Sequence, residues 1–164
     1  MKKVLLTVLL ALVTFTAVSA DIPKGWTVDI NAALKQAKAE KKQVLLLFTG
    51  SDWCGWCIRL KKDVFSKNEF KKLAADRFVL VSFDFPHRKK ISDEQQKIQL
   101  QWQKKIGVSG YPTTVILDSN GKQLHKISGY MPLKDYLKAI YPAYRDKSGK
   151  DMKSKSSSQA VTIR

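Results

Sequence analysis

Residues 43–57 read QVLLLFTGSDWCGWC, and this stretch decides how the rest of the sequence is interpreted. The run from Val44 to Phe48 is apolar without a break and has the length of a strand buried on both faces. The next four residues, TGSD, end this run, and a helical pattern of apolar residues follows. Cys54 and Cys57 are the only cysteines of the chain and form a C-x-x-C pair. The sequence therefore predicts a site at a strand-to-helix junction that contains every thiol of the protein.

Apolar spacing on either side of this stretch predicts alternating helices and strands. Asp29 can cap a helix, and Ser92 with Gln95 resembles a capping box at the start of a polar helix. The Asn120-Gly121 turn favours an antiparallel hairpin, whereas helices between the early strands favour a parallel βαβ unit. We predict an α/β fold with a central mixed β-sheet flanked by helices. The expected elements are helix 30–41, strand 44–48, a helix from the cysteines to about residue 64, helix 68–75, strand 78–83, helix 92–105, strands 113–117 and 123–128, and helix 132–141.

The two ends of the 164-residue chain differ in composition from its middle. Residues 1–20 combine a basic start, a short apolar run and small residues up to Ala20, which is typical of a signal peptide cleaved after that residue. Cleavage would remove two lysines and lower the formal net charge from +16 to +14. Residues 21–142 have the length of one domain, and residues 143–164 are basic and polar, as in a disordered tail. We therefore expect an exported, single-domain protein.

The position of the cysteine pair at the start of a helix predicts thiol chemistry. A helix N-terminus offers unpaired N–H groups and the positive end of the helix dipole, and both favour thiolate over thiol. We expect this placement to lower the pKa of Cys54 from about 8.5 into the range of about 3.5–7.5. Cys57 lies one turn further along, where we expect it to be more buried and less acidic. Cys54 is the predicted attacking nucleophile and Cys57 the predicted resolving thiol.

The wider sequence resembles the thioredoxin superfamily. The resemblance rests on FTGSDWCGWC at residues 48–57 and on GYPT at residues 110–113, and it covers roughly residues 30–141. In particular, the chain is similar to exported thioredoxin-like thiol reductases of the DsbH type and, more distantly, to the C-terminal domain of the reductase DsbD. The resemblance implies a thioredoxin-like fold, a periplasmic location and protein-disulfide reductase activity. It also implies that Pro112 follows a cis peptide bond and that the backbone of Tyr111 pairs with an incoming substrate strand.

Three residues next to the cysteines complete the predicted substrate-binding set. Trp53 is either a core residue or a partly exposed ring that covers the cysteines, and the sequence leaves both possibilities open. Gly55 and Trp56 lie between the cysteines, where we expect Trp56 to be exposed and to face the substrate. This Gly-Trp pair departs from the Gly-Pro of thioredoxin, at a place where residues tune the redox potential.

The resemblance fails at the position of the proton acceptor. Thioredoxins commonly bury an acidic residue six positions before the first cysteine, and here that position is Phe48. The lysine that often accompanies this acid would fall near Ser82. Deprotonation of Cys57 is therefore left to water, to Asp84 or Asp52, or to the leaving thiolate. We also expect Asp52 to cap the active-site helix and Asp84 to bond to loop backbone.

Other functions stay open at this point. The protein could be a net oxidant or an isomerase in disulfide formation or, without enzymatic activity, a polypeptide-binding module. A zinc site would need His87 and His125, whose spacing is unlike that of a zinc finger, so we expect both at the surface. A purely structural disulfide would stabilise little, because it would close a very short loop. The net positive charge suggests nucleic-acid binding as an alternative function, but the basic residues do not interleave with aromatic residues as such a surface would require.

The expected partners follow from these assignments. Substrates would be disulfide-containing proteins or small-molecule disulfides, and a redox partner would supply electrons. We expect no cofactor, no metal, no nucleic acid and no integral membrane segment after signal cleavage. A monomer is expected because the site uses both cysteines, which leaves none for an intermolecular disulfide.

Overall fold

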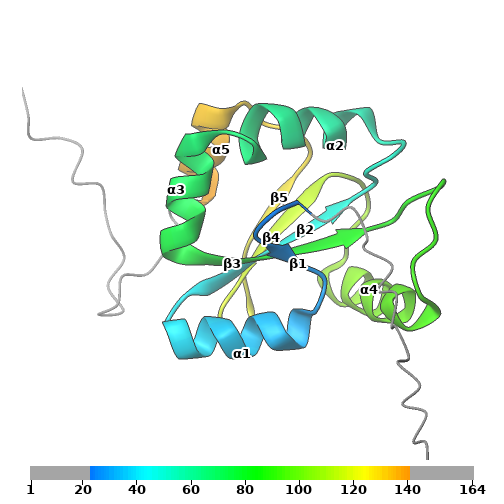
Figure 1. Ribbon diagram of the computed structural model, residues 1–164, viewed down its shortest axis with the longest axis horizontal. Helices are drawn as coiled ribbons and strands as arrows, with labels where there is room; N and C mark the ends of the chain where they lie inside the picture. Colours follow the sequence, from blue (N-terminus) through cyan, green and yellow to red (C-terminus); the bar gives the residue numbers. More distant parts are fainter. Residues whose placement is uncertain (1–22, 141–164) are drawn as a thin grey trace, which may run out of the picture.

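A computed structural model describes residues 23–140, which form one five-stranded sheet covered by helices on both faces (Figure 1). The strand order is β1-β3-β2-β4-β5. The central strand β2 pairs with β3 in parallel and with β4 antiparallel, while β5 closes an antiparallel hairpin with β4 and β1 lies parallel at the β3 edge. The strands are β1 (Trp26–Thr27), β2 (Gln43–Thr49), β3 (Phe78–Asp84), β4 (Thr113–Leu117) and β5 (Gln123–Ser128).

The helices divide between the two faces of the sheet, as Figure 1 shows. Helices α1 and α4 cover one face, and α2, α3 and α5 cover the other. A π-helical turn, η1, continues α2 towards α3. The elements are α1 (Ile30–Glu40), α2 (Gly55–Leu60), η1 (Lys61–Phe65), α3 (Asn68–Arg77), α4 (Asp93–Ile106) and α5 (Leu133–Ile140).

Two hydrophobic cores follow from the alternation of side chains along the central strand. Leu46 and Phe48 of β2 are buried with α1 and β3 residues in the first core. Leu45 and Leu47 point the other way and pack with η1, α3 and α5 in the second core. A strand buried on both faces has to be apolar throughout, and this explains the unbroken run from Val44.

The predicted helix caps are partly correct. Asp29 accepts a hydrogen bond from the backbone N–H of Ala32 at 2.9 Å, and Ser92 accepts one from the N–H of Gln95 at 3.2 Å. Among the described residues, the reciprocal bond from the Ser92 N–H to the Gln95 side chain is not formed, and the Gln95 Nε2 donates to the carbonyl of Val28 at 3.2 Å. Ser92 therefore caps α4 as predicted, whereas the Gln95 side chain connects α4 to the segment before α1.

The predicted fold class is confirmed, with the expected mixed sheet and flanking helices. Two elements were not predicted: β1, whose two residues are too few for a periodic pattern, and the π-helical turn after α2. The predicted signal peptide and basic tail lie outside residues 23–140, so the domain limits stay a prediction. Within residues 23–140, no helix is both long and apolar enough to cross a membrane.

Candidate active site

Cys54 and Cys57 form a disulfide at the start of α2, with their Cα atoms 5.2 Å apart. Cys54 is itself the N-cap of this helix, and its Sγ accepts a hydrogen bond from the N–H of Cys57 at 3.2 Å. The exposed fraction is 7% for Cys54 and 4% for Cys57. Because a backbone N–H points at the Cys54 sulfur, negative charge on that sulfur is favoured when the disulfide is open.

The loop before β4 lies against the first cysteine. The Tyr111-Pro112 peptide bond is cis, as the resemblance implied. The carbonyl oxygen of Tyr111 lies 3.7 Å from the Sγ of Cys54. Thr113 holds this loop, since its hydroxyl donates to the carbonyl of Gly110 at 2.8 Å. The arrangement brings backbone polar groups next to the sulfur, where an extended chain could pair with them.

Trp53 lies over the loop that leads to the cysteines and is 42% exposed. Its Nε1 donates to the carbonyl of Phe85 at 2.7 Å, and its ring stacks on His87 with centroids 4.5 Å apart. Gly50 lies beneath the ring, and a Cβ at that position would come within 2.5 Å of it. Of the two possibilities for Trp53, the partly exposed ring is the one observed. His87 is exposed, as expected, although it is stacked.

Trp56 is 56% exposed, as expected, and belongs to a cluster that sequence reasoning missed. Its ring lies 5.5 Å from that of Tyr130, and the guanidinium of Arg59 lies over both rings at 5.6 and 5.0 Å. Tyr130 donates to Asp63 at 3.0 Å, and this bond lowers the pKa of the Asp63 carboxyl. No sequence pattern connects Tyr130, which follows β5, with Trp56. Beside them, Gly55 has open space around its Cα.

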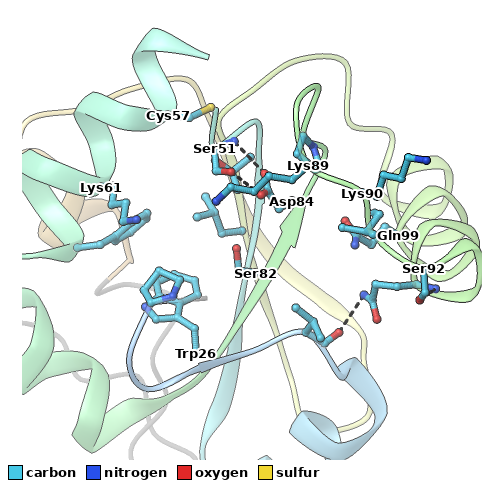
Figure 2. A pocket seen from close by; sticks show the side chains of 18 residues that line it. Trp26, Ser51, Cys57, Lys61, Ser82, Asp84, Lys89, Lys90, Ser92 and Gln99 are labelled. Carbon is cyan, nitrogen blue, oxygen red and sulfur yellow. Dashed lines mark hydrogen bonds between the residues drawn. The ribbon is translucent and has the colours of Figure 1, made fainter. Parts of the chain in front are cut away.

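The side of the pair that faces the sheet adjoins a cavity whose lining includes several polar side chains. A cavity of about 570 Å³ extends below Cys57 and is also lined by Ser51, Ser82 and Asp84 (Figure 2). Asp84 accepts hydrogen bonds from the backbone N–H of Ser51 at 2.8 Å and from its hydroxyl. The expectation that Asp84 bonds to loop backbone is therefore confirmed. Asp84 also shares a water-accessible space with the second cysteine.

The position six residues before Cys54, where thioredoxins commonly bury an acid, does not face the cysteines in this fold. Phe48 does not lie at the acceptor position facing the cysteines, because its side chain points into the core under α1 and contacts Phe83. The β2 residues on the cysteine side are its two neighbours, Leu47 and Thr49. Counting back from Cys54 does not locate the acceptor position, because the face of the sheet on which a side chain lies depends on the strand's register and not on its distance from a cysteine.

Asp52 does not cap α2. Its carboxylate accepts hydrogen bonds from the backbone N–H groups of His87 and Arg88, at 3.0 and 2.7 Å. These bonds, that from His87 above all, lower the pKa of Asp52. Asp52 therefore fastens the segment after β3 beside the active-site loop, and Cys54 takes the capping position instead. Within residues 23–140, no group of three or more His, Cys, Asp or Glu side chains could hold a metal ion.

A mixed sheet with a C-x-x-C pair at a helix start and a cis-proline loop against it defines the thiol–disulfide oxidoreductase class of proteins. The chain belongs to the thioredoxin-like domain family, whose profile matches residues 30–142.

Individual relatives agree with this membership. The chain is 36% identical over 100 residues to the disulfide bond reductase DsbH of Chlamydia pneumoniae, covering 61% of this chain and 60% of the relative. It is 29% identical over 133 residues to the thioredoxin-related protein DsbJ of the same organism, covering 78% of this chain and 38% of that protein. A solved structure of a DsbH oxidoreductase superimposes with a TM-score of 0.66 at 28% identity, covering 77% of this chain and 92% of that one. The chain thus spans less than two thirds of the length of both curated relatives.

Proposed function

We propose that this protein is an exported, periplasmic thiol–disulfide oxidoreductase that reduces disulfides. The observation that carries the proposal is the Cys54–Cys57 pair at the start of α2, with the cis-proline loop against its first sulfur. The reducing direction is supported by the similarity to a protein named disulfide bond reductase. The periplasmic location is supported by the signal-like composition of residues 1–20.

The reaction uses the two sulfurs in sequence. The thiolate of reduced Cys54 attacks one sulfur of the substrate disulfide, so that a mixed disulfide forms and the other substrate sulfur leaves as a thiolate, which takes up a proton. Cys57 then loses its proton and attacks the Cys54 sulfur. The mixed disulfide breaks, the second substrate thiol leaves and the Cys54–Cys57 disulfide forms. The substrate gains two electrons, which a redox partner must return to the cysteine pair.

Asp84 is the group best situated to accept the proton of Cys57. Both residues line the same cavity, and water in this space can carry a proton between them. Asp52 is a poorer candidate, because its carboxylate faces the backbone N–H groups of His87 and Arg88 and does not line the cavity that Asp84 shares with Cys57.

Substrate would bind on the opposite side of the pair. The backbone of Tyr111 beside Pro112 offers hydrogen bonds to an extended chain, and the exposed rings of Trp53 and Trp56 offer flat apolar surface. Gly55 has no side chain, and the space beside its Cα is open. This arrangement suits disulfides in polypeptides, and small-molecule disulfides can reach the same sulfur.

Reduction of insulin by dithiothreitol tests the proposal. We expect the protein to accelerate it and Cys54→Ser to abolish the acceleration; an unaccelerated rate would contradict the activity. Retention of polypeptide binding by Cys54→Ser, with no catalysis by the wild type, would indicate a binding module instead. A redox titration against glutathione tests the direction, because a potential near about −120 mV is that of a strong oxidant.

A further inference from the structure

The cavity below Cys57 has a size and lining that the exchange reaction does not require. Its volume of about 570 Å³ lies within the range of small-molecule sites, roughly 300–1,000 Å³. The reaction itself needs room only for a proton and a few waters at one end of this space. Much of the wall is apolar and comes from the segment before α1, the end of β2, η1 and the segment before α4, namely Pro23, Trp26, Val28, Leu47, Phe65 and Ile91.

One buried polar atom in this wall has no partner. Gln99 of α4 is 1% exposed and lines the cavity, towards which its side chain points in Figure 2. Its Oε1 accepts no hydrogen bond within the described part of the chain. A buried carbonyl oxygen without a donor is unfavourable, so native proteins normally supply one from protein, water or ligand. An N–H or O–H group in the cavity would supply the donor that Gln99 lacks.

The charge around the cavity is positive. Lys61 of η1 and the pair Lys89 and Lys90 all line it, from opposite sides in Figure 2. Among the described lining residues, Asp84 is the only acid, and it already accepts two hydrogen bonds from Ser51. An anionic group in the cavity would therefore meet lysine ammonium groups at the rim.

We propose that this cavity binds a small amphipathic anion. Its apolar body would lie against Trp26 and Phe65, its anionic group would meet the lysines at the rim, and an N–H or O–H group would donate to Oε1 of Gln99. The site is separate from the surface at which Cys54 meets substrate, and binding involves no covalent step. It can therefore be tested on the oxidised protein, independently of any activity.

Anilinonaphthalene sulfonate is a suitable probe, because it combines two aromatic ring systems, one N–H group and one anion, and it fluoresces in apolar surroundings. We expect saturable binding to the folded, oxidised protein, weakened by added salt. Phenylnaphthylamine has the same rings and N–H group without the anion, so its binding should be weaker and independent of salt. Absence of saturable binding, as in a cavity that holds water only, would overturn the proposal.

Two sets of variants assign the binding to this cavity. Gln99→Leu should weaken both probes about fivefold, the loss of one hydrogen bond. Gln103→Leu is the matched control, because Gln103 also lies on α4 with a buried unpaired Oε1 but does not line the cavity. Both variants replace an amide by an apolar group of similar size, and circular dichroism would be used to check that they fold.

The double change Lys61→Gln and Lys90→Gln should weaken the sulfonate probe about threefold or more and leave phenylnaphthylamine unaffected. Changing Lys62 and Lys105 to Gln removes the same charge outside the cavity and serves as its control. Binding that survives the Gln99 and lysine changes but is lost in Trp56→Ala would place the probe on the exposed rings of Trp53 and Trp56. This result would overturn the proposal.

Discussion

The two sulfurs of the site lie in contrasting surroundings. Cys54 lies against the carbonyl of Tyr111, and Trp53 and Trp56, close to it in the sequence, have exposed rings. Below Cys57 lies a cavity with a carboxylate and hydroxyl groups at one end. The two cysteines are chemically identical in the sequence. We propose that these different surroundings give them different roles, the first to meet a large partner and the second to exchange a proton within the protein.

The largest effect should come from exchanging the two sulfurs for oxygen in turn. Cys57→Ser should retain attack on the substrate but lose release, so a mixed disulfide with Cys54 accumulates and turnover falls at least about a thousandfold. Cys54→Ser should form no such adduct. Mass spectrometry of the protein after incubation with an oxidised peptide distinguishes the two. An adduct of equal yield on both variants would show that the two sulfurs are equivalent and would contradict the different roles proposed for them.

Asp84→Asn should slow the release step while leaving the first attack unchanged. Loss of a general base typically costs about a hundredfold in rate, and the deficit should shrink at high pH, where hydroxide removes the Cys57 proton. Rapid-mixing measurement of mixed-disulfide decay across pH values separates this step.

Asp52→Asn is the matched control for Asp84→Asn, since Asp52 lies in the neighbouring loop but not in the cavity. If Asp84→Asn lowers the rate of mixed-disulfide decay by the same factor at every pH, Asp84 has a structural role and does not accept the proton.

Trp56→Ala tests the proposed substrate-binding surface formed by Trp53, Trp56 and the backbone of Tyr111. We expect the KM for a polypeptide disulfide to rise about fivefold because apolar contact area is lost, whereas kcat and the rate with a small-molecule disulfide stay close to those of the wild type. Leu100→Ala, which removes an exposed apolar side chain on α4, is the control and should change neither. An equal loss with both substrates would indicate that Trp56 acts on the sulfurs and not on the bound chain.

The smallest effect should appear at Asp52, whose pKa is lowered by the backbone N–H groups of His87 and Arg88. A depressed folded-state pKa contributes stability above the unfolded-state value of about 3.9 and loses it as the pH falls through the folded value. The unfolding midpoint of Asp52→Asn should therefore lie slightly below that of the wild type at pH 7. This difference should begin to shrink as the pH falls below about 4 and should vanish only below the lowered folded-state pKa of Asp52. Denaturant titrations at both pH values measure it, and a constant difference would exclude ionisation as the cause.

Sequence reasoning was reliable where a pattern is local. The buried strand before the cysteines, the helices capped by Asp29 and Ser92 and the hairpin at Asn120 are all observed near their predicted positions. The cis bond before Pro112 was predicted by resemblance, because composition carries no such signal. β1 was missed because its two residues are held by pairing with β3 and not by any preference of their own.

The sequence by itself determined that both thiols lie together at a strand-to-helix junction, because strand and helix periodicity and C-x-x-C spacing are properties of neighbouring residues. The tertiary structure alone decided which side chains surround each sulfur. Phe48 faces the opposite core and Asp84 the cavity because the register between β2 and β3 fixes the face of every residue along them. Asp52 bonds to His87 and Tyr130 bonds to Asp63, 35 and 67 residues away along the chain, respectively. Contacts between residues so far apart produce no periodic pattern in the sequence.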